Sequence, residues 1–276
     1  MEDKPLPAKP LIEARNLSQR YAQRQTVTGK TLRIQALDRV DFFIAPGASL
    51  ALVGQSGSGK STLARCLMRL EEPSEGTIWF EGRNLLAMSR AELFAVRRRM
   101  QLILQDPASA FNPRLDAAEI VAEPLLIQGL GTREARREKA LHFIQKAGLL
   151  PEWAGKLPLE LSGGQRQRLA IARALVMEPE FLIFDEALSG LDLSIQAQIV
   201  NLLIELRAAH SLTYLFITHD LALAGVLAEE IAVMHEGHIV ERARTPELFT
   251  NARHPASQAL LASMTVAQTG VASRTK

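Results

Sequence analysis

The sequence predicts an α/β fold with a core built on a parallel sheet, an antiparallel β subdomain near its start and an inserted α-helical subdomain. Two observations carry this prediction. Short apolar strands alternate with helical segments along much of the 276 residues, which is typical of a parallel sheet covered by helices. Between residues 106 and 161 the strand signal stops, and helix-forming stretches are punctuated by five prolines instead.

We take the elements in chain order. Residues 1–10 are polar and broken by prolines, so we expect a flexible arm. Short apolar runs between Leu11 and Ile44 predict antiparallel strands, joined by a long exposed loop over Gln23–Lys30 and extending to Ala36. Compact apolar runs predict strands, and helical spacing predicts helices. The strands are Ser49–Val53, Gly76–Phe80, Met100–Leu104, Phe181–Phe184, Thr213–Thr218 and Ile231–Met234, and the helices are Ser61–Leu70, Asp116–Gln128 and Thr132–Ala147.

These elements divide the chain into parts. Residues 11–105 form the first part of the core with the antiparallel subdomain, and 106–170 form the helical subdomain. Residues 171–240 complete the core, and 241–276 form an extension whose residues from about Ala262 are small and polar, which predicts a frayed end.

Composition excludes several classes of protein. The 32 Lys and Arg residues against 30 Asp and Glu give a net charge of +2, too small to indicate nucleic-acid or membrane-surface binding. A lone cysteine, Cys66, excludes an internal disulfide framework and a clustered thiolate metal site, and fits a reducing cytosol. The start of the chain lacks an apolar signal segment, and the longest apolar runs are far shorter than the roughly 20 residues that cross a bilayer.

Residues 54–61, GQSGSGKS, fit the pattern GxxxxGK[ST] between an apolar strand and a helix. Glycines let backbone N–H groups wrap a phosphate, the helix adds the positive end of its dipole, Lys60 supplies a charge and Ser61 can hold magnesium. A Gly/Ser-rich turn with a chance lysine is the alternative. The flanking strand and helix favour the phosphate loop.

A second motif ends an apolar strand in two carboxylates, at Phe181–Glu186. Asp185 can coordinate magnesium, and Glu186 can polarise a water molecule. The same pattern alone also fits a strand that simply leaves the core. A phosphate loop in the same chain favours the functional interpretation.

Residues 161–165, LSGGQ, resemble the signature motif of ABC-family ATPases, and the similarity is continuous over residues 161–192. It then extends from about Leu11 to Leu261. The resemblance implies a P-loop NTPase (RecA-like) core that binds ATP and Mg²⁺. It also implies that LSGGQ completes the ATP site of a second ATPase subunit in a head-to-tail dimer.

The resemblance assigns roles residue by residue. The residues implied to bind ATP are Tyr21, whose ring would stack on adenine, and Gly54, Gln55, Ser56, Gly57, Ser58, Gly59, Lys60, Ser61 and Thr62. The residues implied in catalysis are Gln105, Glu186 and His219. The residues implied in metal binding are Ser61, Gln105 and Asp185. The signature comprises Leu161, Ser162, Gly163, Gly164 and Gln165, and the D-loop comprises Ser189, Gly190, Leu191 and Asp192.

Several of these residues have a simpler interpretation. Tyr21 could be a core aromatic at a strand end, and His219 a strand-end hydrogen-bonding group. Cys66 fits inert packing behind the phosphate loop. The basic runs Arg97–Arg99 and Arg133–Lys139 fit solvated helix faces, with a phosphate or lipid contact as the alternative.

Within the family, the chain resembles importer ATPases that serve peptides, nickel and related metal chelates. The matching segments are Gln105–Pro107, Phe111–Arg114, Ser194–Gln198 and His254–Leu261. Ala187 stands where most members have proline, and Ala256 stands where peptide-type members usually have tyrosine. The cysteine cluster of some peptide-importer ATPases is also missing. The identity of the transported solute, a peptide or a nickel-type chelate, is therefore left open.

The resemblance implies two membrane permeases, a second and non-identical ATPase, and an extracytoplasmic solute-binding protein, with this subunit on the cytoplasmic face of a bacterial inner membrane. No nucleic acid is expected. A non-transport ABC ATPase in DNA repair or translation is the alternative, although the near-neutral charge disfavours it.

Overall fold

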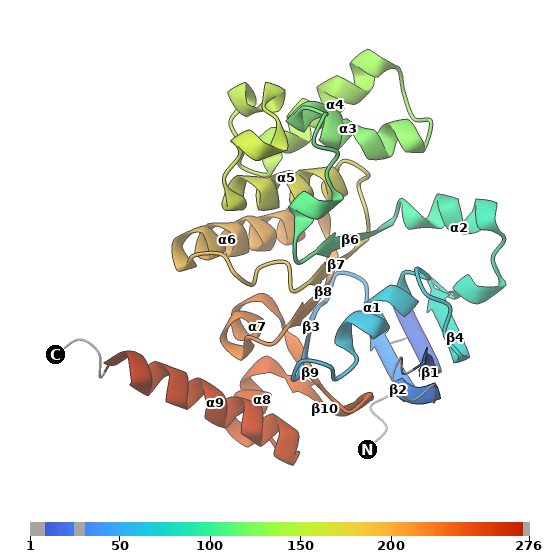
Figure 1. Ribbon diagram of the computed structural model, residues 1–276, viewed down its shortest axis with the longest axis vertical. Helices are drawn as coiled ribbons and strands as arrows, with labels where there is room; N and C mark the ends of the chain where they lie inside the picture. Colours follow the sequence, from blue (N-terminus) through green and yellow to red (C-terminus); the bar gives the residue numbers. More distant parts are fainter. Residues whose placement is uncertain (1–8, 25–30, 273–276) are drawn as a thin grey trace. The chain divides into compact units, whose positions relative to one another are not determined.

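The computed structural model describes residues 9–24 and 31–272, which fall into two compact units. The first unit holds the chain up to Leu93 and again from Leu215, and the second holds Phe94–Tyr214. Figure 1 shows strands and helices in both. The expected arm over residues 1–10 lies almost entirely outside the described residues.

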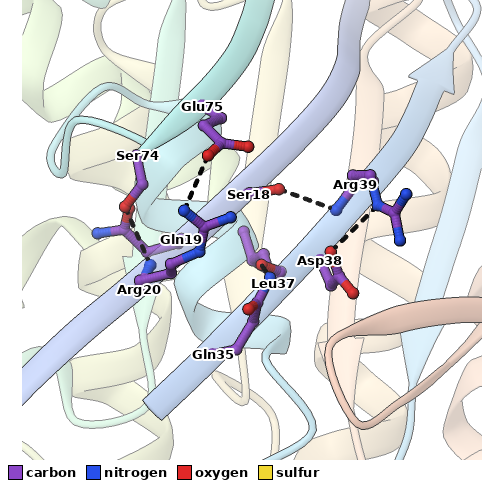
Figure 2. Close-up of polar contacts among 9 residues, drawn as sticks. All are labelled: Ser18, Gln19, Arg20, Gln35, Leu37, Asp38, Arg39, Ser74 and Glu75. Carbon is purple, nitrogen blue, oxygen red and sulfur yellow. Dashed lines mark hydrogen bonds and ion pairs between the residues drawn. The ribbon is translucent and has the colours of Figure 1, made fainter. Parts of the chain in front are cut away.

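The first unit contains an antiparallel sheet with strand order β2-β1-β4-β5. Its strands are β1 (Ile12–Arg24), β2 (Thr31–Ile44), β4 (Glu75–Phe80) and β5 (Arg83–Asn84). The register between β1 and β2 shifts three times between Ala14 and Arg20. Side chains take up backbone donors there: the N–H of Arg39 donates to Ser18 Oγ at 3.0 Å, and the N–H of Arg20 donates to Ser74 Oγ at 3.0 Å (Figure 2). These two hydrogen bonds satisfy backbone donors where the regular ladder is interrupted.

The same unit holds strands in the order β10-β9-β3-β8. β3 (Ser49–Val53) runs parallel to β9 (Glu230–His235), and β10 (His238–Arg244) returns antiparallel to β9. β8 (Thr213–Thr218) begins at the unit boundary. The helices of this unit are α1 (Lys60–Leu67), α7 (Leu221–Leu227), α8 (Thr245–Asn251) and α9 (Pro255–Ala272), and η1 (Leu85–Ala87) and α2 (Arg90–Arg97) lead to the boundary.

The second unit pairs β6 (Met100–Leu104) with β7 (Phe181–Asp185) in parallel. Helices α3, α4 and α5 pack on one another, and α6 contacts α5 (Figure 1). These helices are α3 (Ala117–Ile127), α4 (Arg133–Lys146), α5 (Gly163–Leu175) and α6 (Leu193–His210), with 3₁₀ turns η2 (Pro107–Ala110), η3 (Pro151–Gly155) and η4 (Pro158–Glu160).

Local capping chemistry starts the helices of this unit. Asp116 caps α3 in a reciprocal box with Glu119, and Thr132 caps α4. Asp192 caps α6 through its side chain. The core of the unit lies around β7, whose five residues are all buried, and Phe184 meets Tyr214 edge to face with ring centroids 5.5 Å apart.

The α/β class, the parallel pairings and the antiparallel sheet confirm the predicted fold, whose strands and middle helices agree within one residue at each end. Two details were wrong. The loop predicted over Gln23–Lys30 does not extend to Ala36, because β1 continues to Arg24 and β2 already starts at Thr31. The helix expected to reach Leu70 ends at Leu67, and Arg69 has a left-handed φ of 48°.

Helix α9 continues to Ala272. The expectation of a frayed end from about Ala262 stays a prediction. The division expected at residues 105, 170 and 240 stays a prediction.

Candidate active site

The phosphate loop lies in the first unit, between β3 and α1. All five residues of β3 are buried, and the chain then turns through Gly54–Gly59 into α1. Lys60 is only 5% exposed, and its Nζ donates to the carbonyl oxygens of Gly54 and Gln55, both at 2.8 Å. The ammonium group is therefore folded over the loop, where a phosphate oxygen would compete with these carbonyls for it.

Gly59 makes this geometry possible. It occupies the N-cap of α1 with φ of 109°, a conformation that L side chains rarely adopt. A Cβ there would also collide with the carbonyl oxygen of Ala36 on β2. None of the described side chains caps α1, and its first turn also carries Ser61 and Thr62. A helix start of this kind suits an anion.

Tyr21 lies beside this helix. Its hydroxyl donates to the carboxylate of Glu71 and lies 3.4 Å from Oγ1 of Thr62. Burial, reinforced by the Glu71 hydrogen bond, raises the pKa of the phenol, so the group stays protonated and can donate. The structure thus brings one predicted adenine contact to the end of the predicted phosphate loop.

The same unit holds two further residues of interest. His219 is exposed directly after β8, and the next residue, Asp220, caps α7 by accepting from the N–H groups of Ala222 and Leu223. Cys66 is buried on α1, and burial raises the pKa of its thiol to about 12. A thiol that stays protonated is no nucleophile, which supports inert packing.

Three predicted catalytic and metal residues meet at one edge of the second unit. Leu104 of β6 pairs with Asp185 of β7 in parallel register, so Gln105 and Glu186 follow the ends of neighbouring strands. Asp185 is 8% exposed and Glu186 half-buried. Glu186 also has φ of 51°, an uncommon conformation outside glycine that recurs at active sites.

The LSGGQ segment begins α5 in the same unit. Ser162 and Gln165 form a capping box: the Gln165 N–H donates to Ser162 Oγ at 3.3 Å, and the Ser162 N–H donates to Gln165 Oε1 at 2.8 Å. Leu161 and Gly164 are buried, whereas Ser162 and Gly163 are exposed. The helix start therefore presents a serine and a glycine at the surface of this unit.

The segment Ser189–Asp192 connects β7 to α6. Ser189 Oγ donates to the carbonyl oxygen of Glu186 at 2.6 Å, and the Ser189 N–H donates to the same oxygen at 3.1 Å. Asp192 accepts from the N–H of Ile195 at 2.9 Å and caps α6. The segment is thus fastened at one end to Glu186 and at the other to a helix.

Comparisons with known proteins agree with this arrangement. The family model described as "ABC transporter" matches residues 37–189. The chain belongs to the ABC transporter family. The provisionally named oligopeptide transport ATP-binding protein YkfD of Bacillus subtilis (strain 168) is 43% identical over 258 residues, covering 93% of this chain and 77% of that protein.

Two further matches extend the comparison. The glutathione import ATP-binding protein GsiA of Salmonella paratyphi A is 40% identical over 267 residues, covering 96% of this chain and 43% of that protein. Among solved structures, the post-hydrolysis dimer of the ATP-binding cassette MJ0796, bound to ADP and phosphate, has a TM-score of 0.75 at 30% identity, covering 85% of this chain and 98% of the cassette. The core of this ABC transporter ATPase is accordingly of the P-loop NTPase type.

ATP and Mg²⁺ fit the residues present in this ABC transporter ATPase. Backbone glycines and a buried lysine suit a triphosphate, and Mg²⁺ is usually held by one or two carboxylates together with phosphates and water. Among the described residues, no group of three or more His, Cys, Asp or Glu side chains could hold a metal ion. None of the described helices is long and apolar enough to span a membrane.

Two contacts at the site were missed from the sequence. Glu71, the partner of Tyr21, is fifty residues away along the chain and carries no motif. Ile195 follows the D-loop and contacts the signature helix. Ile195 left no local signal in the sequence. For Glu71 the only signal was an acidic residue shortly after the end of α1, which is a candidate partner for a tyrosine at a strand end.

Proposed function

We propose that this chain binds and hydrolyses ATP as a subunit of an ABC importer for di- or oligopeptides. The observation that carries the proposal is the similarity to import ATP-binding proteins over 93–96% of the chain, in a protein whose Lys60 is folded over a phosphate loop. The relatives are named for oligopeptide transport and glutathione import, and glutathione is a tripeptide.

In the proposed mechanism, the loop residues 54–59 and Lys60 bind the terminal phosphates, and Tyr21 stacks on adenine. Ser61, Gln105 and Asp185 would hold Mg²⁺, which would supply positive charge next to the phosphates. Glu186 polarises the attacking water as general base, and the strained backbone at this residue aims its carboxylate. His219 contacts the γ-phosphate.

The active form is proposed to be a head-to-tail pair of ATPase subunits. Leu161, Ser162, Gly163, Gly164 and Gln165 complete the ATP site of the partner, whereas Lys60 serves the site of its own chain. The solved MJ0796 cassette is dimeric and bound to ADP and phosphate, which supports a paired active form. The second subunit is proposed to be non-identical, and the pair to serve two permeases and an extracytoplasmic binding protein at the cytoplasmic face of a bacterial inner membrane.

Peptides are favoured over nickel-type chelates as the transported solute. YkfD is named for oligopeptide transport and GsiA for glutathione import, which supports a peptide. Ala187 and Ala256 depart from the usual importer pattern, and a nickel-type chelate is therefore kept as an outcome of the test. A non-transport role in DNA repair or translation is not favoured, because these relatives are all import ATPases.

The test is reconstitution of the full transporter in vesicles, with its binding protein loaded in turn with a tripeptide, a nickel chelate or a single amino acid. We expect the tripeptide to raise ATP turnover several-fold. Stimulation by the chelate alone would replace the peptide assignment and leave the ATPase intact. A complex that hydrolyses no ATP, or one unaffected by Glu186→Gln, would refute the enzymatic part.

A further inference from the structure

The two glycines of the signature motif have different surroundings. Gly163 is exposed, and a Cβ built on it has no described atom within 4 Å. Gly164 is buried, and a Cβ built on it would lie 2.5 Å from Cγ2 of Ile195 on α6. Gly164 does not have a positive φ, so its role here is to leave space for Ile195.

A second contact lies one helical turn further along the same pair of helices. Arg168 Nη2 donates to Gln198 Oε1 at 3.0 Å, and Arg168 Nη1 donates to the carbonyl oxygen of Ala147 at 3.0 Å. Residues four apart on α5 and three apart on α6 lie on one face of each helix. The two contacts therefore form one interface between α5 and α6, which lie next to each other in Figure 1.

The first turn of α6 is in turn fastened to the segment that starts at Glu186. Ile195 donates its N–H to the Asp192 side chain at 2.9 Å, and Gln196 Nε2 donates to the carbonyl oxygen of Leu188 at 3.2 Å. Ser189 bonds the carbonyl oxygen of Glu186 through both its N–H and its hydroxyl. A continuous set of short contacts thus joins Gly164 to Glu186.

We propose that Ile195 is a positioning residue, seated in the space that Gly164 leaves, which couples the signature motif to the segment carrying the general base. This inference rests on the proposed function. The signature serves the ATP of the partner subunit, whereas Glu186 serves the ATP of its own chain. A shift of α5 when the partner's nucleotide binds would move α6 and, through Asp192 and Ser189, the backbone of Glu186.

The test is a rescue experiment on the full chain. Gly164→Ala places a methyl group against Ile195 Cγ2, and we expect kcat for ATP hydrolysis to fall at least tenfold while the Kd for ATP stays within about twofold. Adding Ile195→Ala removes Cγ2 and should restore kcat to within about threefold of the Ile195→Ala single variant. Ile195→Val is the matched control, because it keeps the β-branch and should not rescue Gly164→Ala.

Loss of turnover in Gly164→Ala with no rescue by Ile195→Ala would overturn the inference, and so would wild-type turnover in Gly164→Ala. If Gly164→Ala unfolds, Gln198→Ala tests the same interface at an exposed position, with an expected fall in kcat of about twofold to fivefold. An unchanged kcat there would then count against the coupling. Absence of ATP hydrolysis by the wild-type protein in the assembled transporter overturns the proposed function as well, whereas an active transporter with failed rescue overturns this inference alone.

Discussion

The ring of Tyr21 can be separated experimentally from its hydroxyl, because the two groups have different proposed partners. The hydroxyl contacts Glu71 and Thr62, which are parts of the protein. The ring is proposed to stack on adenine. Tyr21→Phe removes only the hydroxyl, and Tyr21→Ala removes both groups. Comparison of the two variants therefore distinguishes a nucleotide contact from a core aromatic.

The expected magnitudes differ accordingly. Stacking of a base on an aromatic ring contributes about 1–3 kcal/mol, so Tyr21→Ala should weaken ATP binding about fivefold to 150-fold. Tyr21→Phe should leave it nearly unchanged. The Tyr21 hydroxyl donates to a charged carboxylate, but the group is partly exposed. In Tyr21→Phe, Glu71 still has its ion pair with Arg65 Nη1, at 3.2 Å. We therefore expect Tyr21→Phe to cost about 1 kcal/mol of stability, or about 2–4 °C in Tm.

Titration calorimetry with ATP and with inorganic tripolyphosphate provides the assay, since the second ligand has no base. Tyr21→Ala should weaken ATP binding and leave tripolyphosphate binding unchanged. The matched control is the other tyrosine, Tyr214, whose buried hydroxyl donates to the carbonyl oxygen of Leu203 at 3.1 Å. Tyr214→Phe should lower Tm without changing ATP affinity. Unchanged ATP affinity in Tyr21→Ala, with a lower Tm, would show that Tyr21 is only a core aromatic.

Three further predictions concern catalysis, assembly and pH. Glu186→Gln should keep ATP affinity and lower phosphate release about 10²–10⁴-fold, whereas near-wild-type turnover would assign the base elsewhere. In equilibrium titrations of the isolated chain, Lys60→Ala should weaken ATP binding, whereas Ser162→Arg should leave ATP affinity unchanged. Ser162→Arg should nevertheless abolish ATP turnover. A loss of ATP affinity in Ser162→Arg would contradict the shared site. Burial opposes ionisation of Glu241, but hydrogen bonds from the backbone N–H groups of Arg253 at 2.9 Å and His254 at 3.0 Å help to hold its pKa below the usual 4.5. The stabilisation is therefore complete above pH 4.5 and is lost as the pH falls through the lowered pKa, so Glu241→Gln should lower Tm by about 2–4 °C at pH 7 and by progressively less below pH 4.5 in thermal unfolding scans.

Features that depend on neighbours a few residues away could be predicted from the sequence. The helix limits around Asp116 and Thr132 agree with the prediction from helical spacing, and the structure shows why they are local: each cap bonds a backbone N–H three residues later. The phosphate loop was predicted for the same reason, since its lysine and glycines act within eight residues of chain. The ends of β6 and β7 were predicted to within one residue, and their parallel pairing brings Gln105 near Glu186.

Errors arose where a local pattern was weak or ambiguous. The polar stretch Gln23–Lys30 hid where β2 begins, so the loop was predicted to extend to Ala36. Pairing with β1 stabilises that stretch as a strand, because a ladder of hydrogen bonds outweighs a marginal strand preference.

The motifs predicted which residues are proposed to handle ATP, because phosphate chemistry requires particular side chains at short, regular spacing. They could not distinguish Gly163 from Gly164, which are neighbours of the same type in one motif. Packing of α5 on α6 separates them, leaving one glycine exposed and the other against Ile195. The left-handed backbone of Glu186 and the bond from Tyr21 to Glu71 likewise appear only in three dimensions. These features depend on segments distant in the chain approaching within a few ångströms, and sequence spacing carries no record of that approach.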